Sequence, residues 1–174
     1  NKAYITTKIA IKLDPNYALA HCNLGAIYKE QKKLNKAEES TKKAIKLNPN
    51  YAKAYYNLGF ILRDNCKLLE AEKATREAIK LKTDYKEAFL NLGVILKDLD
   101  KLKEAEKATK EAIKLNKNYS EAYYNLGAIH LENGKIKEAE EITKYAINLD
   151  PNQYKFHANL GFIYEKQGRL DQSE

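Results

Sequence analysis

Apolar residues recur at steps of three and four along the chain, in two stripes within each stretch of 34 residues. In residues 52–85 the first stripe runs through Tyr55, Leu58 and Leu62. After a polar break at residues 65–67, a second stripe runs from Leu68 to Leu81. This spacing places the apolar side chains on one face of a helix. We therefore expect two amphipathic helices joined by a short turn, and an all-α fold.

The helix pair is repeated at a fixed interval. The tripeptide Asn-Leu-Gly recurs every 34 residues, beginning at Asn23, Asn57, Asn91, Asn125 and Asn159. Residues 52–85 and 86–119 are identical at 21 of 34 positions, and a fixed period of this length is typical of solenoids. We expect one solenoid over 1–174, cut from a longer protein. Its units are the second helix of a truncated repeat (1–17), full repeats (18–51, 52–85, 86–119, 120–153) and a truncated final repeat (154–174).

Glycine recurs inside each predicted first helix, where it costs about 1 kcal/mol relative to alanine. Because this loss of helix stability is repeated in every unit, we infer that a side chain larger than hydrogen does not fit at this position. We expect two helix backbones to approach closely at Gly25, Gly59, Gly93, Gly127 and Gly161, with Ala37, Ala71, Ala105 and Ala139 opposite.

Both ends of the helices carry local signals. The predicted N-caps of the first helices are Asn16, Asn50, Asp84, Asn118 and Asn152, because their side chains can accept hydrogen bonds from exposed N–H groups. The turns between the two helices of a pair end at Lys32, Cys66, Asp100, Gly134 and Gly168. We expect left-handed backbone at these five positions, as is common after a helix.

These features resemble the tetratricopeptide repeat family, with its 34-residue helix–turn–helix unit. The Leu-Gly pair, the two alanines of the second helix and the closing proline are in register. The repeat style is similar to bacterial members and to the repeat arm of O-linked N-acetylglucosamine transferases. The resemblance implies a right-handed α–α superhelix of antiparallel helix pairs, with first helices lining the concave face. The chain departs from the family in having threonine where the second helix usually has an aromatic residue: Thr41, Thr75, Thr109 and Thr143.

The first helices carry a candidate peptide-binding surface. Each has one asparagine, whose amide offers donors and an acceptor to a peptide backbone, and beside it apolar residues outside the core stripe. The candidate residues are Asn23, Asn57, Asn91, Asn125, Asn159, Tyr56, Phe60, Leu90, Val94 and Tyr124. In the transferase arm that this chain resembles, a similar asparagine ladder holds substrate peptides. The alternative is a structural role for the asparagines at a neighbouring helix end.

Composition narrows the function classes. The chain is 44% hydrophobic and 32% charged, with a net charge of +7, which disfavours a disordered chain, and it has no apolar run long enough for a membrane span. Nucleic acid is an unexpected partner despite the positive charge, because recurring cations follow a glutamate by four residues, a stabilising pair on a helix. These pairs are Glu38–Lys42, Glu72–Arg76, Glu106–Lys110 and Glu140–Lys144.

No catalytic, metal or cofactor site is expected. His21, His130 and His157 occupy positions that are aromatic or aliphatic in sister repeats, which indicates packing. No nucleophile and base are paired by a recognisable motif. Two cysteines, Cys22 and Cys66, are expected to be free thiols, and the lack of a disulfide pattern favours the cytoplasm.

The sequence therefore predicts a scaffold whose partner is a protein or peptide. Two alternatives remain open. The chain could be the substrate-recognition arm of a larger transferase, or it could self-associate end to end through apolar helix faces left uncovered at the truncated repeats.

Overall fold

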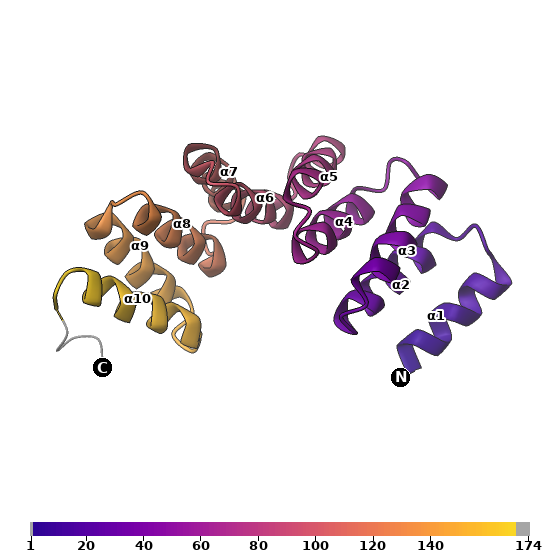
Figure 1. Cartoon of the computed structure of the whole chain (residues 1–174), viewed down its shortest axis with the longest axis horizontal. Coiled ribbons are helices and arrows are strands. Elements are labelled where there is room, and N and C mark those ends of the chain that lie inside the picture. The colour runs from indigo at the N-terminus through magenta and orange to yellow at the C-terminus, as the bar shows by residue number, and fades with distance from the viewer. Residues whose placement is uncertain (1, 170–174) are drawn as a thin grey trace. The chain divides into compact units, whose positions relative to one another are not determined.

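The computed structural model describes residues 2–169, which form α-helices and contain no strand, as the sequence predicts (Figure 1). The helices are α1 (Lys2–Leu13), α2 (Ala18–Glu30), α3 (Leu34–Leu47), α4 (Ala52–Asp64), α5 (Leu68–Leu81), α6 (Lys86–Asp98), α7 (Leu102–Leu115), α8 (Ser120–Glu132), α9 (Ile136–Leu149) and α10 (Tyr154–Lys166). The second helix expected after α10 lies outside the described residues.

The helix pairs recur with the same 34-residue period as the sequence. The first helices of the pairs, α2, α4, α6, α8 and α10, each have 13 residues, and the second helices α3, α5, α7 and α9 each have 14. Helix α1 occupies the register of a second helix. It buries no residue, and Ile5, Ile9 and Leu13 are exposed on it.

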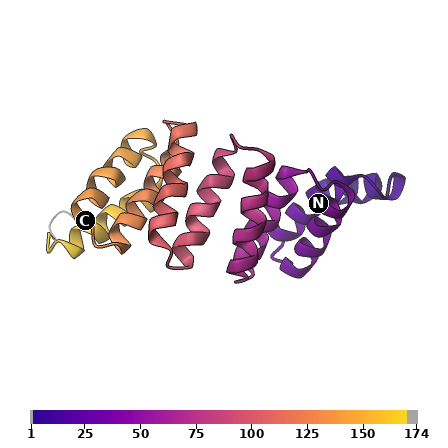
Figure 2. The same cartoon turned by 90° about the horizontal axis from the view of Figure 1, so that it is seen from above.

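The chain forms two compact units, residues 1–91 and residues 92–174, with the boundary inside α6. In unit 1, α2 packs on α3 and α4 packs on α5, while α3 also packs on α4 and α1 packs on α2. In unit 2, α8 packs on α9, and it also contacts α7, while α9 contacts α10. Figure 2 shows α2 with α3 and α8 with α9 lying side by side. Helices α3 and α9 are therefore each shared between their own pair and the next first helix.

The predicted close approach is confirmed at four of the five helix glycines, Gly25, Gly59, Gly93 and Gly127, and stays a prediction at Gly161. A methyl group on Gly59 would overlap the Thr75 hydroxyl and lie 3.3 Å from the Ala71 carbonyl oxygen of α5. Thr75 is fully buried, and its hydroxyl donates to that same carbonyl over 2.9 Å. Equivalent contacts join Gly25 to Thr41, Gly93 to Thr109 and Gly127 to Thr143. The threonine that departs from the family pattern is thus the residue packed directly on the glycine.

The predicted N-caps are wrong. Helices α2, α4 and α8 follow Tyr17, Tyr51 and Tyr119, and no side chain caps them. A polar side chain acts earlier instead: Asn48 Oδ1 accepts the N–H of Asn50 over 3.1 Å. The same contact joins Asn116 to Asn118 and Asp14 to Asn16. These are Asx turns, in which the side chain closes the loop between repeats rather than the helix end.

The predicted left-handed turns are confirmed. Lys32, Cys66 and Asp100 have φ values of 58–59°, and Gly134 and Gly168 have φ values of 73° and 71°. The turn after the first helix therefore keeps one backbone conformation whether or not glycine occupies it.

A buried histidine interrupts the apolar core of unit 2. His130 is 8% exposed and occupies the register that Leu62 and Leu96 hold in the two preceding repeats. Its Nε2 lies 3.6 Å from Glu106 Oε1, and among the described residues neither ring nitrogen has a hydrogen-bond partner. Burial lowers the pKa of His130, and Glu106 and Glu138 oppose this while Lys135 and Lys110 reinforce it.

We expect His130→Leu to raise the free energy of unfolding by about 1 kcal/mol at pH 7, because it removes an unsatisfied buried imidazole. The gain should grow as the pH falls below about 6.5, the usual histidine pKa. Since the folded pKa is lowered, the unfolded chain binds the proton more readily, and acidification therefore destabilises the native state. Urea denaturation from pH 7.5 to pH 5 measures both effects. Equal pH dependence of the two proteins over this range would contradict the prediction.

Candidate functional site

The three candidate asparagines of unit 1 differ in exposure and in partner. Asn23 is exposed. Asn57 is half-buried, and its Nδ2 donates to Cys22 Sγ over 3.2 Å. Asn91 is 3% exposed, and its Nδ2 donates to Thr75 Oγ1 over 3.2 Å. The same register in three first helices therefore gives three different environments.

The two candidate asparagines of unit 2 are half-buried. Asn125 Nδ2 donates to the Glu121 carbonyl oxygen over 2.8 Å, one turn earlier on α8. Asn159 Nδ2 donates to Thr143 Oγ1 of α9 over 3.3 Å. Both amides are held by the protein through their NH₂ groups.

The Oδ1 oxygen of each of the five amides accepts no hydrogen bond from the described residues, and Asn91 Oδ1 is buried without a partner. An amide oxygen can accept two hydrogen bonds. The sequence predicted amides with donors and acceptor both available. In the structure, the NH₂ groups already donate within the protein, so only the Oδ1 acceptor is left without a protein partner. This holds for Asn57, Asn91, Asn125 and Asn159.

Aromatic rings gather beside Asn57 in sequence and in space. Tyr56 contacts Phe60 edge to face with centroids 5.9 Å apart, and it contacts Tyr85 at 5.1 Å. Lys29 Nζ lies 4.2 Å from the centre of the Phe60 ring. Burial raises the pKa of Tyr56, and it raises that of Tyr85 to about 12, so both phenols are neutral. The sequence analysis missed Tyr85, although tyrosine recurs at this register as Tyr17, Tyr51 and Tyr119.

The remaining apolar candidates are also half-buried. Leu90 and Val94 lie one turn apart on α6. In unit 2, Tyr124 stacks on Phe156 with centroids 5.0 Å apart and an interplanar angle of 26°. Lys155 Nζ lies 5.7 Å from the centre of the Tyr124 ring. Phe156 was also missed, because its place in the first turn of α10 gives no sign that it meets α8.

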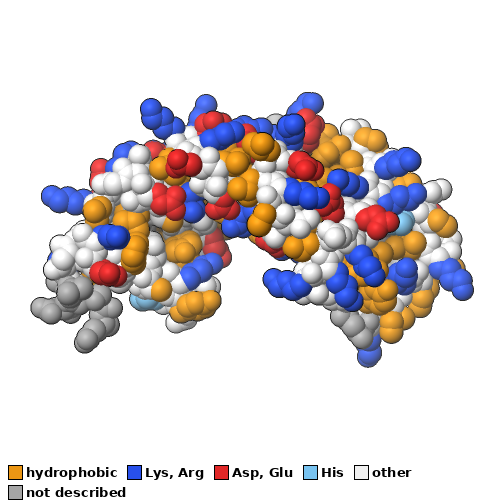
Figure 3. Space-filling model, in the orientation of Figure 1, with side chains coloured by type: hydrophobic (Ala, Val, Ile, Leu, Met, Phe, Trp, Pro, Cys, Tyr) orange, Lys and Arg blue, Asp and Glu red, His pale blue; other side chains and the backbone are white. Residues whose placement is uncertain are grey.

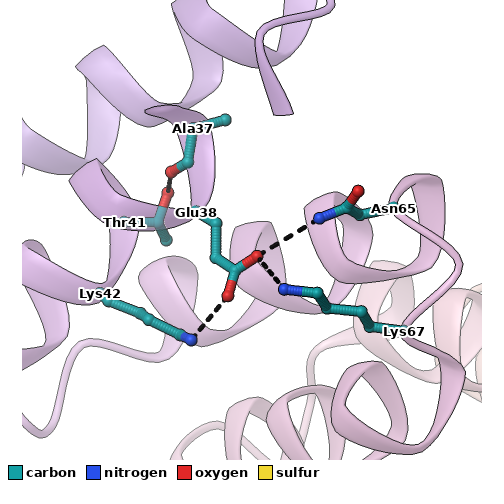
Figure 4. Close-up of polar contacts among 6 residues, drawn as sticks. All are labelled: Ala37, Glu38, Thr41, Lys42, Asn65 and Lys67. Atoms are coloured by element: carbon teal, nitrogen blue, oxygen red, sulfur yellow. Dashed lines mark hydrogen bonds and ion pairs between the residues drawn. The ribbon is translucent and has the colours of Figure 1, made fainter. Parts of the chain in front are cut away.

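Salt bridges neutralise most of the recurring cations on the second helices. Figure 4 shows Glu38, whose Oε1 accepts from Lys42 over 2.6 Å and whose Oε2 accepts from Lys67 over 2.9 Å. The hydrogen bond from Lys42 is the main cause of a lowered pKa of Glu38. The first cation was predicted. The second, which comes from the turn of the next repeat, was not, because the 29-residue spacing does not place two side chains on one helix.

The same arrangement in unit 2 is centred on Glu140. Its Oε1 accepts from Lys144 over 2.6 Å, and its Oε2 accepts from Gln167 over 2.8 Å and Arg169 over 3.0 Å. The hydrogen bond from Lys144, followed by that from Gln167, lowers the pKa of Glu140 to about 2. We call Glu38, Glu72, Glu106 and Glu140 the inter-repeat carboxylates.

The histidines and cysteines are not assembled into a reactive centre. His21 and His157 each place Nε2 against a proline carbonyl oxygen, at 2.9 Å for Pro15 and 2.8 Å for Pro151. His157 is exposed, so the expectation that it is a buried or half-buried packing residue is wrong. Burial raises the pKa of the Cys22 thiol, which favours its unreactive protonated form. Within residues 2–169, no three histidine, cysteine or acidic side chains are grouped to hold a metal ion.

None of the described helices has the length and apolar content needed to cross a bilayer.

Sequence profiles of one family match most of the chain. Tetratricopeptide repeat profiles cover residues 18–51, then 41–73, 108–141 and 143–174, and also 86–119. A comparison with curated protein sequences finds no match.

Solved structures of similar fold cover nearly the whole chain. MamA is 27% identical with a TM-score of 0.74, over 86% of this chain and 88% of its own. YrrB, a tetratricopeptide protein with an unusual peptide-binding site, is 23% identical with a TM-score of 0.73, over 96% and 86%. PilW, a type IV pilus biogenesis factor, is 21% identical with a TM-score of 0.90, over 97% and 79%. Together with the repeated helix pairs and these likenesses, the profile matches show that the chain belongs to the tetratricopeptide repeat family.

Proposed function

We propose that the chain is a protein-interaction scaffold that holds an extended peptide segment of a partner protein along its first helices. The observation that carries the proposal is the set of asparagine Oδ1 atoms that accept no hydrogen bond from the described residues. The Oδ1 atoms of Asn57, Asn125 and Asn159 are not buried, so a ligand can reach them, whereas Asn91 Oδ1 is buried and takes no part. A bound peptide backbone would supply the missing N–H donors.

The internal bonds of the amides prepare them for this role. The Nδ2 atoms of Asn57 and Asn125 are held by Cys22 and by the Glu121 carbonyl, so each side chain is fixed before a ligand arrives. A fixed side chain loses less conformational entropy on binding. Each hydrogen bond contributes about 1 kcal/mol net, so useful affinity requires several amides acting together. Contacts to the backbone do not depend on the side chains of the peptide.

Apolar side chains next to the asparagines would select the peptide. In unit 1, Tyr56 and Phe60 form a half-buried aromatic surface, and in unit 2 Tyr124 presents a ring supported by Phe156. Leu90 and Val94 would add aliphatic surface on α6. Rigid aromatic rings provide large contact areas with little loss of entropy. We therefore expect apolar side chains in the peptide segment that contacts the rings of either unit.

A neighbour of the same fold supports this class of ligand, since YrrB is described as having a peptide-binding site. Solenoids of stacked helix pairs commonly bind partners on extended surfaces. The partner itself would be identified by selection of a peptide on this chain.

A twelve-residue random peptide library, displayed on phage and selected on the immobilised chain, supplies the probe. We expect Asn57→Ala in unit 1 and Asn125→Ala in unit 2 each to weaken binding of the selected peptide about five- to tenfold, the equivalent of one hydrogen bond. Isothermal titration calorimetry measures the affinities. Asn148→Ala, at an exposed position of α9, is the matched control and should leave affinity unchanged. Unchanged affinity in both Asn57→Ala and Asn125→Ala would contradict the proposal.

A further inference from the structure

Helix α1 lacks the carboxylate that the later second helices share. Tyr4 occupies the register of the four inter-repeat carboxylates. Lys8 and Lys33 occupy the registers of Lys42 and Lys67, the two cations that Glu38 binds. Lys33 donates to Gln31 Oε1 over 3.0 Å instead. No carboxylate of residues 2–169 forms an ion pair with Lys8. Because tyrosine replaces glutamate at position 4, Lys8 and Lys33 lack the carboxylate partner that Lys42 and Lys67 have in Glu38.

Helix α3 adds positive charge at the same place. Lys36 stands where the next two repeats have Glu70 and Glu104, and Lys43 stands where they have Glu77 and Glu111. Both lysines are exposed on α3 and neither forms an ion pair with a described residue. Glu39 shows the opposite reversal, since the next two repeats have Lys73 and Lys107 there, so the net change over the three positions is one reversal to positive charge.

Three of these lysines, Lys8, Lys36 and Lys43, line a cavity between α1, α2 and α3. The cavity has a volume of about 510 Å³ and is lined by Lys8 and Ile11 of α1, by Leu24 and Tyr28 of α2, and by Lys36 and Lys43 of α3. Its volume lies in the range of small-molecule sites. Figure 3 shows lysine and hydrophobic side chains side by side at the α1–α3 end of the molecule, on the right of the view.

The charge of the cavity is positive. Three lysines line it against one carboxylate, that of Glu39, and His21 is also on its wall. A hydrogen bond with Tyr28 is the main cause of a lowered pKa of Tyr4; burial opposes it, and the charges of Lys8, Lys33 and Lys36 add to it. The lysine ammonium groups form the polar side of the cavity, and Ile11, Leu24 and the Tyr28 ring form its apolar side.

We infer that this cavity is an anion-binding site for a phosphomonoester that carries an apolar group. A phosphomonoester has a charge near −2 at pH 7 and three acceptor oxygens, which matches three lysines that Glu39 only partly offsets. Its apolar group lies on Leu24, Ile11 and Tyr28. A lysine binds phosphate as a point charge without fixed geometry, so the recognition is of charge and of the attached apolar group. The site is separate from the asparagines of the first helices and does not depend on the proposed function.

The first test uses phenyl phosphate as the probe, titrated into the whole chain by calorimetry. We expect saturable binding, and a loss of at least about tenfold in affinity in Lys36→Glu/Lys43→Glu, which reverses both charges at the wall. The next two repeats carry glutamate at both positions, so the helix tolerates the change. Lys46→Glu/Lys53→Glu changes the net charge equally at exposed positions outside the cavity. It should weaken binding less than about twofold at 0.15 M salt, because screening limits distant charges.

A second pair of variants tests the origin of the site. Tyr4→Glu restores the carboxylate register and should bind Lys8 and Lys33 as Glu38 binds Lys42 and Lys67. We expect at least about a fivefold loss of phenyl phosphate affinity, with helix content and thermal stability retained. Tyr4→Phe keeps the ring and adds no charge, and should bind as the wild type does.

A second ligand, a phosphotyrosine peptide, locates the source of the phosphate group. A phosphotyrosine peptide that binds more tightly than phenyl phosphate, and still depends on Lys36 and Lys43, assigns the site to a phosphorylated partner segment. Equal affinities assign it to a free phosphate ester, and both results support the anion site. The inference is overturned if phenyl phosphate shows no saturable binding up to about 10 mM. It is also overturned if the control pair loses as much affinity as Lys36→Glu/Lys43→Glu, or if inorganic phosphate binds as tightly as phenyl phosphate.

Discussion

We expect Gly59→Ala to lower the free energy of unfolding by about 2–3 kcal/mol, although alanine is the better helix former. The new methyl group would overlap the hydroxyl of Thr75, which is fully buried and bonded to the Ala71 carbonyl oxygen. That carbonyl lies 3.3 Å from the added carbon. Because the added carbon would meet a short, fully buried side chain and a backbone atom, relieving the overlap requires a shift of one or both groups. Chemical denaturation of the single variant measures the loss.

A double-mutant cycle shows whether the loss comes from this contact. Thr75→Ala removes the overlapping hydroxyl, so Gly59→Ala should be nearly neutral in the Thr75→Ala background. Gly134→Ala is the control: nothing lies within 4 Å of the added carbon, and the strain comes from its φ of +73°. Its cost of about 1 kcal/mol should not change in a Thr143→Ala background. Additive losses for Gly59→Ala and Thr75→Ala would refute the packing explanation.

The second large effect concerns Phe156, which anchors α10 in unit 2. Phe156 is fully buried and stacks on Tyr124 at 5.0 Å. Truncating a buried phenylalanine to alanine costs about 3–5 kcal/mol through lost burial and the cavity that remains. We expect Phe156→Ala to lower the free energy of unfolding by this amount and to release α10 before the rest of unit 2. Hydrogen exchange resolved along the chain measures both.

Phe162 provides the matched control on the same helix. It is 46% exposed, so Phe162→Ala should change the stability by less than about 1 kcal/mol. Equal losses in the two variants would show that position in α10, rather than burial, determines the effect. Because Phe156 supports Tyr124, its truncation should also weaken the binding of the selected peptide, whereas Phe162→Ala should not.

Much of the fold could be predicted because it depends on a period. The recurrence of Asn-Leu-Gly fixed the helix register, and the repeated glycines identified the closest backbone contact. The N-caps failed for a local reason. Asn50 and Asn118 have the right residue type two residues before the helix, but their N–H groups are bound by Asn48 and Asn116. The side-chain hydrogen bond therefore forms within the loop, two residues before the predicted cap, and not at the first turn of the helix.

The candidate surface shows where periodicity stops being informative. Asn57, Asn91 and Asn125 have the same register, yet their NH₂ groups bind a thiol, a hydroxyl and a backbone carbonyl. The difference comes from side-chain rotamers and from the neighbour on the preceding repeat, which the spacing of asparagines does not specify. The 16-residue interval between Thr75 and Asn91, shared by Thr143 and Asn159, was a signal that could have revealed one of these partners.

The central claim is that the asparagine Oδ1 atoms bind the backbone of an extended peptide. The most direct test titrates the selected peptide, with each backbone N–H methylated in turn, into the wild type and Asn57→Ala. At one peptide position, methylation should weaken wild-type binding about five- to tenfold but leave the affinity of Asn57→Ala unchanged, because both changes remove the same hydrogen bond. If every methylation weakens the binding of both proteins equally, the asparagine does not bind the peptide backbone and the account is wrong.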